Sequence, residues 1–253
     1  MTEIDPPPAI LTRDDGATIA YHARAGASPG VVFLGGFMSD MTGTKARALD
    51  AWCQARGQAF LRFDYFAHGA SSGAFRDATI GRWRSDALLV LDGLTEGPQV
   101  LVGSSLGGWL MILAALARPA RVHAMIGIAA APDATEDLMW KRFPPELRQR
   151  ILKEGEARLP SSYAEGGTLL TRRLIEEGRE HLVMRGPIPI RAKTRLLHGM
   201  KDPDVPWQTS LALAEKIESK DVEVTLVKEG DHRLSSEADL ARLMRVLEAT
   251  LTP

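Results

Sequence analysis

One stretch, Gln99–Trp109 with the sequence QVLVGSSLGGW, constrains the fold of this chain more than any other. The apolar run Val100–Val102 predicts a buried strand, and the apolar run Trp109–Leu113 predicts a buried helix. Between them, residues 103–107 fit the pattern G-x-S-x-G. A sharp turn from a strand into a helix holds the central serine in a strained backbone conformation with its hydroxyl exposed. The stretch therefore predicts a nucleophilic serine at position 105.

Ser105 fits this pattern and Ser104 does not, because glycines lie two residues before and two residues after Ser105. If Ser104 were the nucleophile, Val102 and Leu106 would occupy the two small positions, and neither side chain fits there. Ser105 also precedes the expected helix, where backbone N–H groups point toward developing negative charge. The Leu106 N–H is therefore a candidate donor to an oxyanion.

The composition is that of an ordinary globular domain, with 253 residues, 45% of them hydrophobic and 25% charged. A net charge of −1 favours neither a nucleic acid nor an anionic membrane as a partner. The one cysteine, Cys53, excludes an internal disulfide, and the acidic, Pro-rich start lacks the features of a signal peptide. No apolar run approaches the ~18 residues of a membrane-spanning helix. We therefore expect a cytoplasmic protein with no integral membrane segment.

Strands alternate with helices along most of the chain. The expected strands are Ala9–Arg13, Thr18–Ala25, Val31–Leu34, Ala59–Phe63, Val100–Val102, His123–Ala131, Thr194–Leu197 and Val222–Val227. Helices are expected at Thr44–Arg56 and Thr79–Leu94, directly after the serine, and at Trp207–Glu218 and Glu237–Leu251. This alternation predicts an α/β fold with a mostly parallel sheet of about eight strands, flanked by helices on both faces.

The alternation breaks after the sixth expected strand. Residues 133–190 contain charged helical pieces, Glu146–Ala157 and Leu169–Glu180, separated by Pro- and Gly-rich turns. A segment of this length is too long for a plain connection, so it predicts a small helical cap inserted into the core. The expected division is therefore a core of residues 1–132 and 191–253, with a cap formed by residues 133–190.

A serine hydroxyl is a poor nucleophile at neutral pH and needs a base that is oriented by an acid. His232 follows the last expected strand, where a loop at the carboxyl edge of the sheet can reach Ser105. His198 ends a strand beside a glycine and is interpreted as structural. Asp202 is the candidate acid, because it follows the same strand closely, and Asp204 is its competitor. The interpretation is a catalytic triad of Ser105, Asp202 and His232.

The tetrahedral intermediate of such a reaction needs a second N–H donor besides Leu106. Gly35-Gly36-Phe37 follows the third expected strand, and its glycines allow the backbone to approach a substrate, so the Phe37 N–H is the candidate. Asp64 and His68 fit either a metal site, a second acid–base pair, or a loop that packs beneath the serine. The histidines show no metal-ligand spacing, so we expect no metal and no cofactor.

Apolar side chains that could contact an acyl chain occur after the third strand, after Ser105 and in the expected cap. The candidates for this substrate-binding wall are Met38, Met41, Trp109, Met139, Trp140 and Phe143. Methionine adapts to varied shapes, which suits a flexible acyl chain. Some of these side chains fit an ordinary core equally well.

Several motifs together resemble the α/β-hydrolase superfamily, and within it the group of the mitochondrial palmitoyl-protein thioesterase, also known as mycophenolic acid acyl-glucuronide esterase. The motifs are Met41–Ala46, Arg62–Tyr65, the G-x-S-x-G turn, Leu197–Asp202, Val205–Trp207 and Asp231–Arg233. The loop at residues 64–71 is similar to the family's D-x-x-G-x-G-x-S loop, with Ala67 in place of its first glycine. The resemblance implies a serine hydrolase that cleaves acyl esters and thioesters of a small-molecule or acyl-protein substrate.

Two alternatives remain open on the same sequence. The triad could serve a carboxylesterase of another specificity, a C–C hydrolase or a lyase. The fold could also carry a non-catalytic binding protein, because a fold alone does not determine a function. A binding protein has no need of all three triad residues, so the complete set favours an enzyme.

Overall fold

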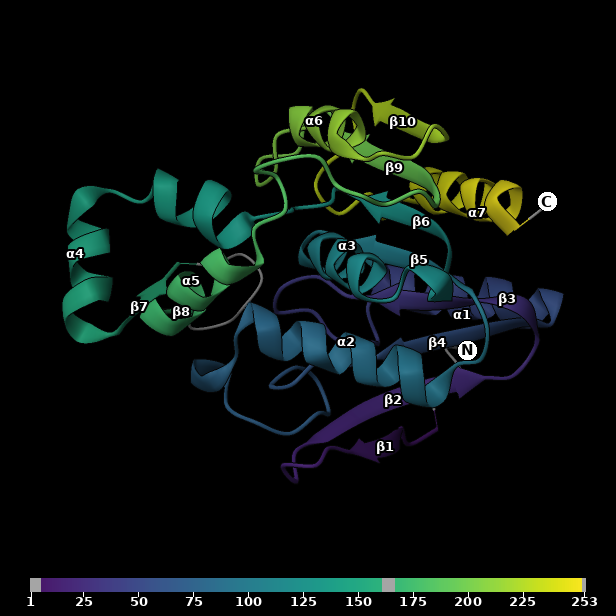
Figure 1. Cartoon of the computed structure of the whole chain (residues 1–253), viewed down its shortest axis with the longest axis horizontal. Helices are drawn as coiled ribbons and strands as arrows, with labels where there is room; N and C mark the ends of the chain where they lie inside the picture. Colours follow the sequence, from purple (N-terminus) through teal and green to yellow (C-terminus); the bar gives the residue numbers. More distant parts are fainter. Residues whose placement is uncertain (1–5, 161–166, 252–253) are drawn as a thin grey trace.

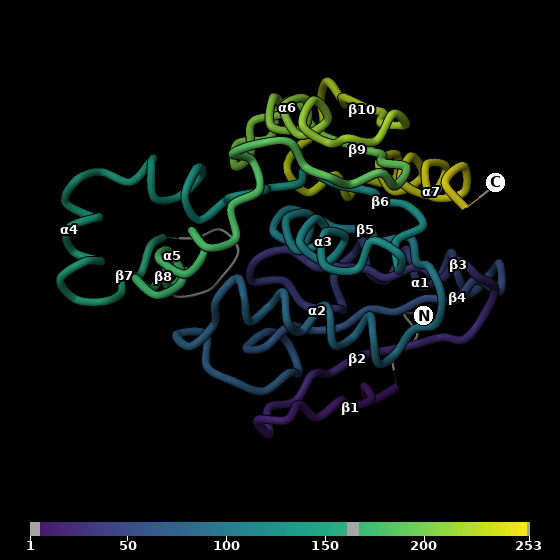
Figure 2. The backbone as a smooth tube through the Cα atoms, viewed as in Figure 1, coloured from purple at the N-terminus to yellow at the C-terminus, as the bar shows by residue number. Residues whose placement is uncertain are grey.

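The computed structural model of the chain describes residues 6–160 and 167–251. Residues 1–5, 161–166 and 252–253 lie outside the described part, and with them the first residues of the acidic N-terminus and one short stretch of the expected cap. Figures 1 and 2 show a central sheet with helices on both sides, and a smaller group of elements that projects away from it.

Eight strands form the central sheet within the described residues. Their order is β1 (Ala9–Thr12), β2 (Thr18–Arg24), β4 (Gln58–Phe63), β3 (Ala27–Leu34), β5 (Gln99–Ser104), β6 (Val122–Ile128), β9 (Lys193–Gly199) and β10 (Val222–Val227). The pairs β1–β2 and β2–β4 are antiparallel, and the other neighbours are parallel. The expected mostly parallel sheet of about eight strands is therefore confirmed.

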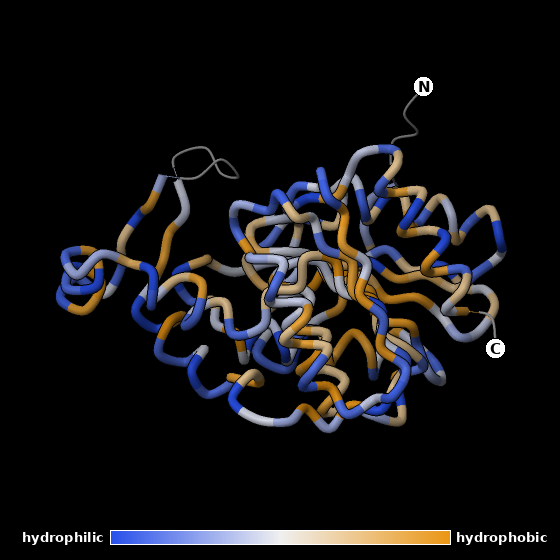
Figure 3. Tube along the Cα trace, turned by 90° about the horizontal axis from the view of Figure 1, so that it is seen from above, coloured by the Kyte–Doolittle hydropathy of each residue, from blue (hydrophilic) through white to orange (hydrophobic). Residues whose placement is uncertain are grey.

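Helices cover both faces of this sheet (Figure 1). They are α1 (Thr44–Arg56), α2 (Ile80–Leu94), α3 (Leu106–Ala117), α6 (Gln208–Lys216) and α7 (Glu237–Leu251), with short turns η1 (Phe75–Asp77) and η2 (Pro119–Arg121). Leu49 and Leu247 pack α1 and α7 against one face, and Trp83, Leu110 and Leu213 pack α2, α3 and α6 against the other. Consecutive residues of the central strands are apolar, as the orange stretch through the middle of Figure 3 shows, and every residue of β5 is buried. None of the described helices is both long and apolar enough to span a membrane.

The projecting group of elements in Figures 1 and 2 lies between β6 and β9. Its elements are η3 (Thr135–Met139), η4 (Trp140–Arg142), α4 (Pro145–Glu154), β7 (Glu156–Leu159), β8 (Thr168–Thr171), α5 (Arg172–Gly178) and η5 (Arg179–His181). The sequence predicts helices over all of Glu146–Ala157 and Leu169–Glu180, and these bounds are wrong. Part of each forms a strand instead, since β7 and β8 pair antiparallel.

Local backbone and packing explain this difference. Gly155 ends α4 with a φ of +83°, a left-handed conformation that favours glycine. The chain then turns into the β7–β8 pair, in which Ala157 and Leu170 lie opposite each other and are both buried. The spacing of Leu170 and Leu174 fits one continuous helix, but Thr171 caps a new helix by accepting the Leu174 N–H at 3.0 Å.

Asp133 ties the two ends of the projecting segment together. Its side chain is fully buried, with Oδ1 accepting the Val183 N–H at 2.7 Å and Oδ2 accepting the Met184 N–H at 3.0 Å. Trp109 of α3 adds a further link, because its Nε1 donates to His181 O at 3.1 Å. The segment is therefore anchored at its base on the side of the sheet that α3 covers.

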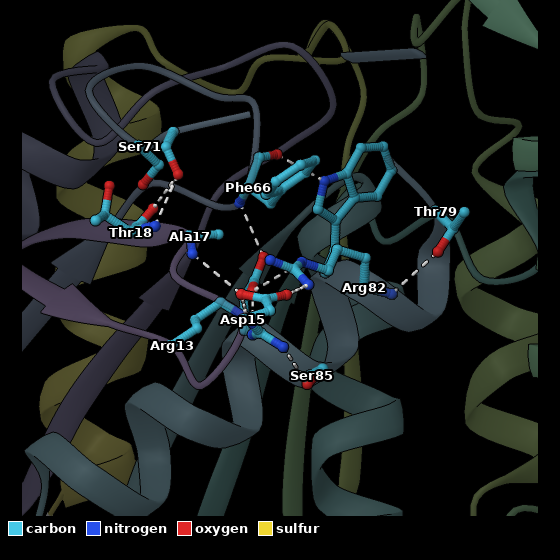
Figure 4. A network of polar contacts seen from close by, with 12 residues as sticks. Arg13, Asp15, Ala17, Thr18, Phe66, Ser71, Thr79, Arg82 and Ser85 are labelled. Atoms are coloured by element: carbon cyan, nitrogen blue, oxygen red, sulfur yellow. Dashed lines mark hydrogen bonds and ion pairs between the residues drawn. The ribbon is translucent and has the colours of Figure 1, made fainter. Parts of the chain in front are cut away.

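A network of charged groups fastens the β1–β2 hairpin to α2 and to the loop after β4 (Figure 4). Arg13 Nη1 donates to Asp86 Oδ1 at 2.5 Å, and Asp86 Oδ2 accepts the Phe66 N–H at 2.8 Å. Arg82 pairs with Asp15 in the hairpin turn. Burial raises the pKa of Asp86 to about 6, and the hydrogen bonds and cations that act in the opposite direction do not offset it. Ionised Asp86 is therefore costly in the folded protein.

The raised pKa of Asp86 predicts that the free energy of unfolding depends on pH. Because its pKa rises from an ordinary 3.8 to about 6 on folding, its contribution to stability is complete below about pH 4 and is lost as the pH rises through about 6. A difference of this size corresponds to about 3 kcal/mol. In urea unfolding, the wild type should lose up to that much stability relative to Asp86→Asn between about pH 4.5 and about pH 7.5. A difference between the two proteins that stays constant with pH would contradict the raised pKa.

Candidate active site

Ser105 lies at the junction of β5 and α3, with a φ of +54° and a ψ of −119°. A positive φ is rare for a residue with a side chain and costs on the order of 1–3 kcal/mol. Three backbone hydrogen bonds hold this turn. The Ser105 N–H donates to Ile128 O at 2.9 Å, and Ser105 O accepts the N–H groups of Gly108 at 2.8 Å and Ala131 at 3.0 Å. The residues at and after the end of β6 therefore fix the serine in its strained conformation.

The glycines around Ser105 permit close packing of the strand and the helix. A Cβ added to Gly103 would lie 2.5 Å from Gly107 O, and one added to Gly107 would overlap Leu34 O at the end of β3. A Cβ on Gly108 would lie 2.5 Å from the Cβ of Ala130. The glycine spacing is therefore a packing requirement, because any side chain at these positions would push α3 away from the sheet.

Ser105, His232 and Asp202 form one hydrogen-bonded series. His232 Nε2 lies 3.0 Å from Ser105 Oγ, and His232 Nδ1 lies 2.7 Å from Asp202 Oδ2. A carboxylate only accepts, so Nδ1 carries the proton and Nε2 is left to accept from the serine. The three residues follow β5, β9 and β10, whose carboxyl ends lie at the same edge of the sheet. The structure thus brings together the three residues that the sequence indicates.

Asp202 accepts four hydrogen bonds. Its Oδ1 binds the N–H groups of Asp204 at 2.8 Å and Val205 at 2.9 Å, and its Oδ2 binds His232 and, at 3.2 Å, His198 Nε2. Burial raises the pKa of Asp202, but the bonds from His198, His232 and Val205 outweigh it and hold this pKa well below its usual range. Asp202 is therefore ionised at neutral pH. Its competitor Asp204 reaches the carboxylate of Asp202 through its backbone N–H.

His198 contributes to the site, although the sequence indicates only a structural residue. Its side chain is fully buried, and its Nε2 lies 3.0 Å from Val205 O as well as 3.2 Å from Asp202. Both of these partners only accept, so Nε2 carries the proton and Nδ1 accepts from Ser210 Oγ at 2.7 Å. A histidine four positions before the acid, at the end of a strand, is the sequence signal for this contact.

The loop after β3 lies beside the serine. A Cβ added to Gly36 would lie 3.6 Å from Ser105 Cβ, so Gly36 and the following Phe37 border the nucleophile. Among the described residues, none accepts a hydrogen bond from the Phe37 N–H or from the Leu106 N–H, the first of α3. Both N–H groups are therefore available to a bound oxyanion.

A cavity of about 600 Å³ reaches Ser105 and His232. Its apolar lining comes from both parts of the chain: Phe37, Met38, Trp83 and Leu106 from the core, and Leu138, Met139, Phe143 and Leu170 from the projecting segment. An apolar cavity with a few polar groups at one point is the usual form of a small-molecule site. The projecting segment therefore completes the wall of the candidate site.

Only some of the side chains expected to form a substrate-binding wall line this cavity. Met38 and Met139 line the cavity, and so does Phe143, but Met41, Trp109 and Trp140 are not among the described residues that line it. Met41 is buried, with its N–H on Asp64 Oδ1 at 2.7 Å, and Trp109 lies entirely within the core. The Arg179 guanidinium covers the ring of Trp140 at 5.3 Å. Met41 and Trp109 are therefore part of the core, and half-buried Trp140 packs against Arg179 instead of the cavity.

Lys45 lines the same cavity and is not singled out by the sequence. Its Nζ donates to Arg233 O at 2.5 Å and to Ser235 Oγ at 3.3 Å, in the loop that carries His232. Burial lowers the pKa of Lys45 to about 8. Lys45 therefore connects the first turn of α1 to the histidine loop, and its place within the Met41–Ala46 motif is the only signal of this role.

One group of side chains has the spacing of a cation site. Ligand atoms of Asp202, Asp204 and His232 lie within 4.8 Å of one another. However, Asp202 and His232 bind each other, and Asp202 Oδ1 binds two backbone N–H groups. Asp64 and His68 also bind backbone N–H groups, those of Met41 and Met38. We assign no metal to these groups, because Asp202 and His232 already bind each other, and Asp64 and His68 already bind backbone N–H groups.

Comparison with known proteins identifies the family. The model of the alpha/beta hydrolase family matches residues 31–245. The chain belongs to the alpha/beta hydrolase family. Together with the relatives described next, this makes the chain a hydrolase.

Relatives of this alpha/beta hydrolase in mouse and human, both named palmitoyl-protein thioesterase ABHD10, mitochondrial, are 45% and 43% identical to it over 241 residues. The match covers 95% of this chain, 81% of the mouse relative and 78% of the human one. The solved structure of mouse alpha/beta hydrolase domain-containing protein 10 has a TM-score of 0.89 at 44% identity, covering 96% of this chain and 98% of that one. The crystal structure of a putative hydrolase from Agrobacterium vitis S4 has a TM-score of 0.92 at 40% identity, covering 98% of this chain and 100% of that one.

These comparisons confirm the resemblance to the thioesterase group and the expectation of an enzyme. They contradict the expected cytoplasmic location, because the relatives from mouse, cattle, orangutan, human and rat are all named mitochondrial. Composition was a poor guide to the compartment, since one cysteine and a net charge of −1 fit several reducing compartments equally well.

Separate replacement of Asp202 and Asp204 by asparagine tests which of the two orients His232. Asp202→Asn should lower kcat on an activated ester by about 10⁴-fold, because an amide favours the wrong tautomer of His232. Asp204→Asn keeps the backbone N–H that binds Asp202, so kcat should fall less than about ten-fold. Steady-state kinetics of the two variants and the wild type checks this, and the opposite ranking would transfer the role of the acid to Asp204.

Proposed function

We propose that this alpha/beta hydrolase cleaves acyl esters and thioesters through an acyl-enzyme on Ser105. The observation that carries the proposal is the hydrogen-bonded series of Ser105, His232 and Asp202 at the wall of a largely apolar cavity. Such a series activates a serine hydroxyl, and an apolar wall favours an acyl chain. The side chains of this series suffice for the reaction without a metal or a cofactor.

In the first half of the proposed reaction, Ser105 Oγ attacks the acyl carbonyl carbon while His232 Nε2 takes the hydroxyl proton. Asp202 stabilises the imidazolium that forms. The N–H groups of Phe37 and Leu106 stabilise the negative charge on the former carbonyl oxygen. When this intermediate collapses, His232 gives the proton to the leaving thiol or alcohol, and the acyl group remains on Ser105.

In the second half, water replaces the leaving group. His232 takes a proton from the water as it attacks the acyl carbon, and the same N–H groups stabilise the second oxyanion. Collapse of this intermediate releases the carboxylic acid and returns the proton to Ser105. The enzyme is then ready for another cycle.

We also propose that residues 133–190 act as a cap that binds the acyl chain. Leu138, Met139 and Phe143 of this segment line the cavity that reaches Ser105. The buried carboxylate of Asp133 binds the far end of the segment, which keeps these side chains in place over the core. Burial of each methylene of an acyl chain against them contributes up to about 0.8 kcal/mol.

The relatives named palmitoyl-protein thioesterase extend this proposal to thioesters of long acyl chains, carried by a protein or by a small molecule. Esters whose leaving group is a sugar, such as acyl glucuronides, require the same acyl-enzyme and belong to the proposed range. The cavity of about 600 Å³ has room for a chain longer than an acetyl group, which favours this range over a carboxylesterase for short acyl groups. A non-catalytic binding protein is disfavoured by the strain at Ser105, which binding alone does not require.

A panel of acyl chain lengths tests this function. For p-nitrophenyl esters and matched thioesters from about two to about sixteen carbons, kcat/KM should rise by up to about four-fold per methylene until the cavity is filled. The measurement is made below the micelle concentration of each substrate. A steady preference for acetyl esters would contradict an acyl-binding cavity.

A variant in the wall supplies the control for this panel. Met139→Asp places a charge in the proposed acyl site without touching the triad. It should lower kcat/KM for long-chain substrates at least about ten-fold. For the acetyl ester, kcat/KM should stay within about three-fold of the wild-type value. An equal loss on all chain lengths would place Met139 outside the acyl site.

A further inference from the structure

The loop after β3 is held from two sides by side chains that the reaction above does not use. Met38 has a φ of +60°, which is strained for a residue with a side chain. Its N–H donates to His68 Nε2 at 3.2 Å. From the other side, Ser39 donates to Gly36 O twice, through Oγ at 2.7 Å and through N–H at 3.2 Å. Each side chain thus holds one of the two peptide groups that flank Phe37.

The partners of His68 fix its protonation. Its Nδ1 lies 3.1 Å from Phe66 O, which only accepts, so Nδ1 carries the proton. Its Nε2 faces the Met38 N–H, which only donates, so Nε2 is the acceptor. The side chain is buried, and burial lowers the pKa of His68, which favours this neutral form. Trp83 Nε1 donates to the same Phe66 oxygen at 3.0 Å, so that carbonyl has a second donor.

Ser39 acts on the peptide whose N–H is the candidate oxyanion donor. In a planar trans peptide the C=O and N–H bonds point in opposite directions. Gly36 O belongs to the same peptide group as the Phe37 N–H, so the two bonds from Ser39 direct that N–H to the opposite side. Because Gly36 borders Ser105, the orientation of this peptide is set next to the nucleophile.

The imidazole of His68 and the ring of Phe37 belong to one aromatic cluster. The Phe37 ring packs edge-on against Phe75 at 5.3 Å and against Trp83 at 5.9 Å, and the His68 ring packs edge-on against Trp83 at 5.2 Å. An apolar side chain at position 68 would keep much of this packing but lose the acceptor. Packing and hydrogen bonding can therefore be separated by a matched pair of variants.

We propose that His68 and Ser39 are positioning residues that preset the Phe37 N–H for the tetrahedral intermediate formed at Ser105. This rests on the proposed function, since it requires acyl transfer at that serine. Donors that are oriented in advance need no reorganisation during the reaction, and the loss of one costs about 10²–10³-fold in kcat. A donor that is present but poorly oriented should therefore lower kcat by a smaller factor.

Three variants test the proposal. His68→Leu removes the acceptor of the Met38 N–H and should lower kcat at least about ten-fold, with KM within about two-fold. His68→Gln, whose Oε1 can accept the same N–H, should restore most of kcat. Ser39→Ala, at an exposed position, should lower kcat in the same way as His68→Leu. A trifluoromethyl ketone, which forms a tetrahedral adduct with an active serine, should lose affinity in parallel with kcat.

The outcomes distinguish this proposal from the proposed function. A wild type that neither hydrolyses esters nor reacts with a fluorophosphonate overturns both. An active wild type whose His68→Leu and Ser39→Ala variants keep full kcat and full affinity for the ketone overturns this proposal alone. If His68→Leu does not fold, Ser39→Ala decides the question, because its side chain lies at the surface.

Discussion

The close approach of α3 to β5 and β3 is the constraint on which the site depends. Gly103 and Gly107 permit this approach, and the turn between them forces Ser105 to a positive φ at the carboxyl edge of the sheet. Because β3, β5, β9 and β10 run parallel, they end at the same edge of the sheet, and the loops that follow them begin there. Ser105 and His232 therefore meet although they are 127 positions apart.

Asp202 is the second point at which several elements meet. A buried carboxylate is costly unless it is paired and hydrogen-bonded, and this one accepts bonds from two histidines and two backbone N–H groups. His198 supplies one of these bonds, and its own orientation depends on Ser210 in α6. The position of His232 therefore depends on the packing of α6 against β9, outside the site itself.

Local sequence patterns predict those helices and strands whose start and end signals lie in or next to the element itself. The expected bounds Thr44–Arg56 agree with α1, because Gly57 ends that helix in a left-handed conformation. The serine turn and the mostly parallel sheet follow from glycine spacing and apolar runs in the same way. The β7–β8 pair, the contact of Trp109 with His181 and the contact of Lys45 with the histidine loop depend on partners distant in sequence. Local patterns in a single sequence do not predict which distant residues are in contact.

The most direct measurement is the position of a fluorophosphonate adduct, found by mass mapping of peptides from the labelled protein. The adduct should lie on Ser105, should form equally in Ser104→Ala, and should be absent from Ser105→Ala, because only Ser105 lies within hydrogen-bonding distance of His232 among these two serines. An adduct on Ser104 or on another residue, or labelling that persists in Ser105→Ala, would contradict the assignment of the nucleophile.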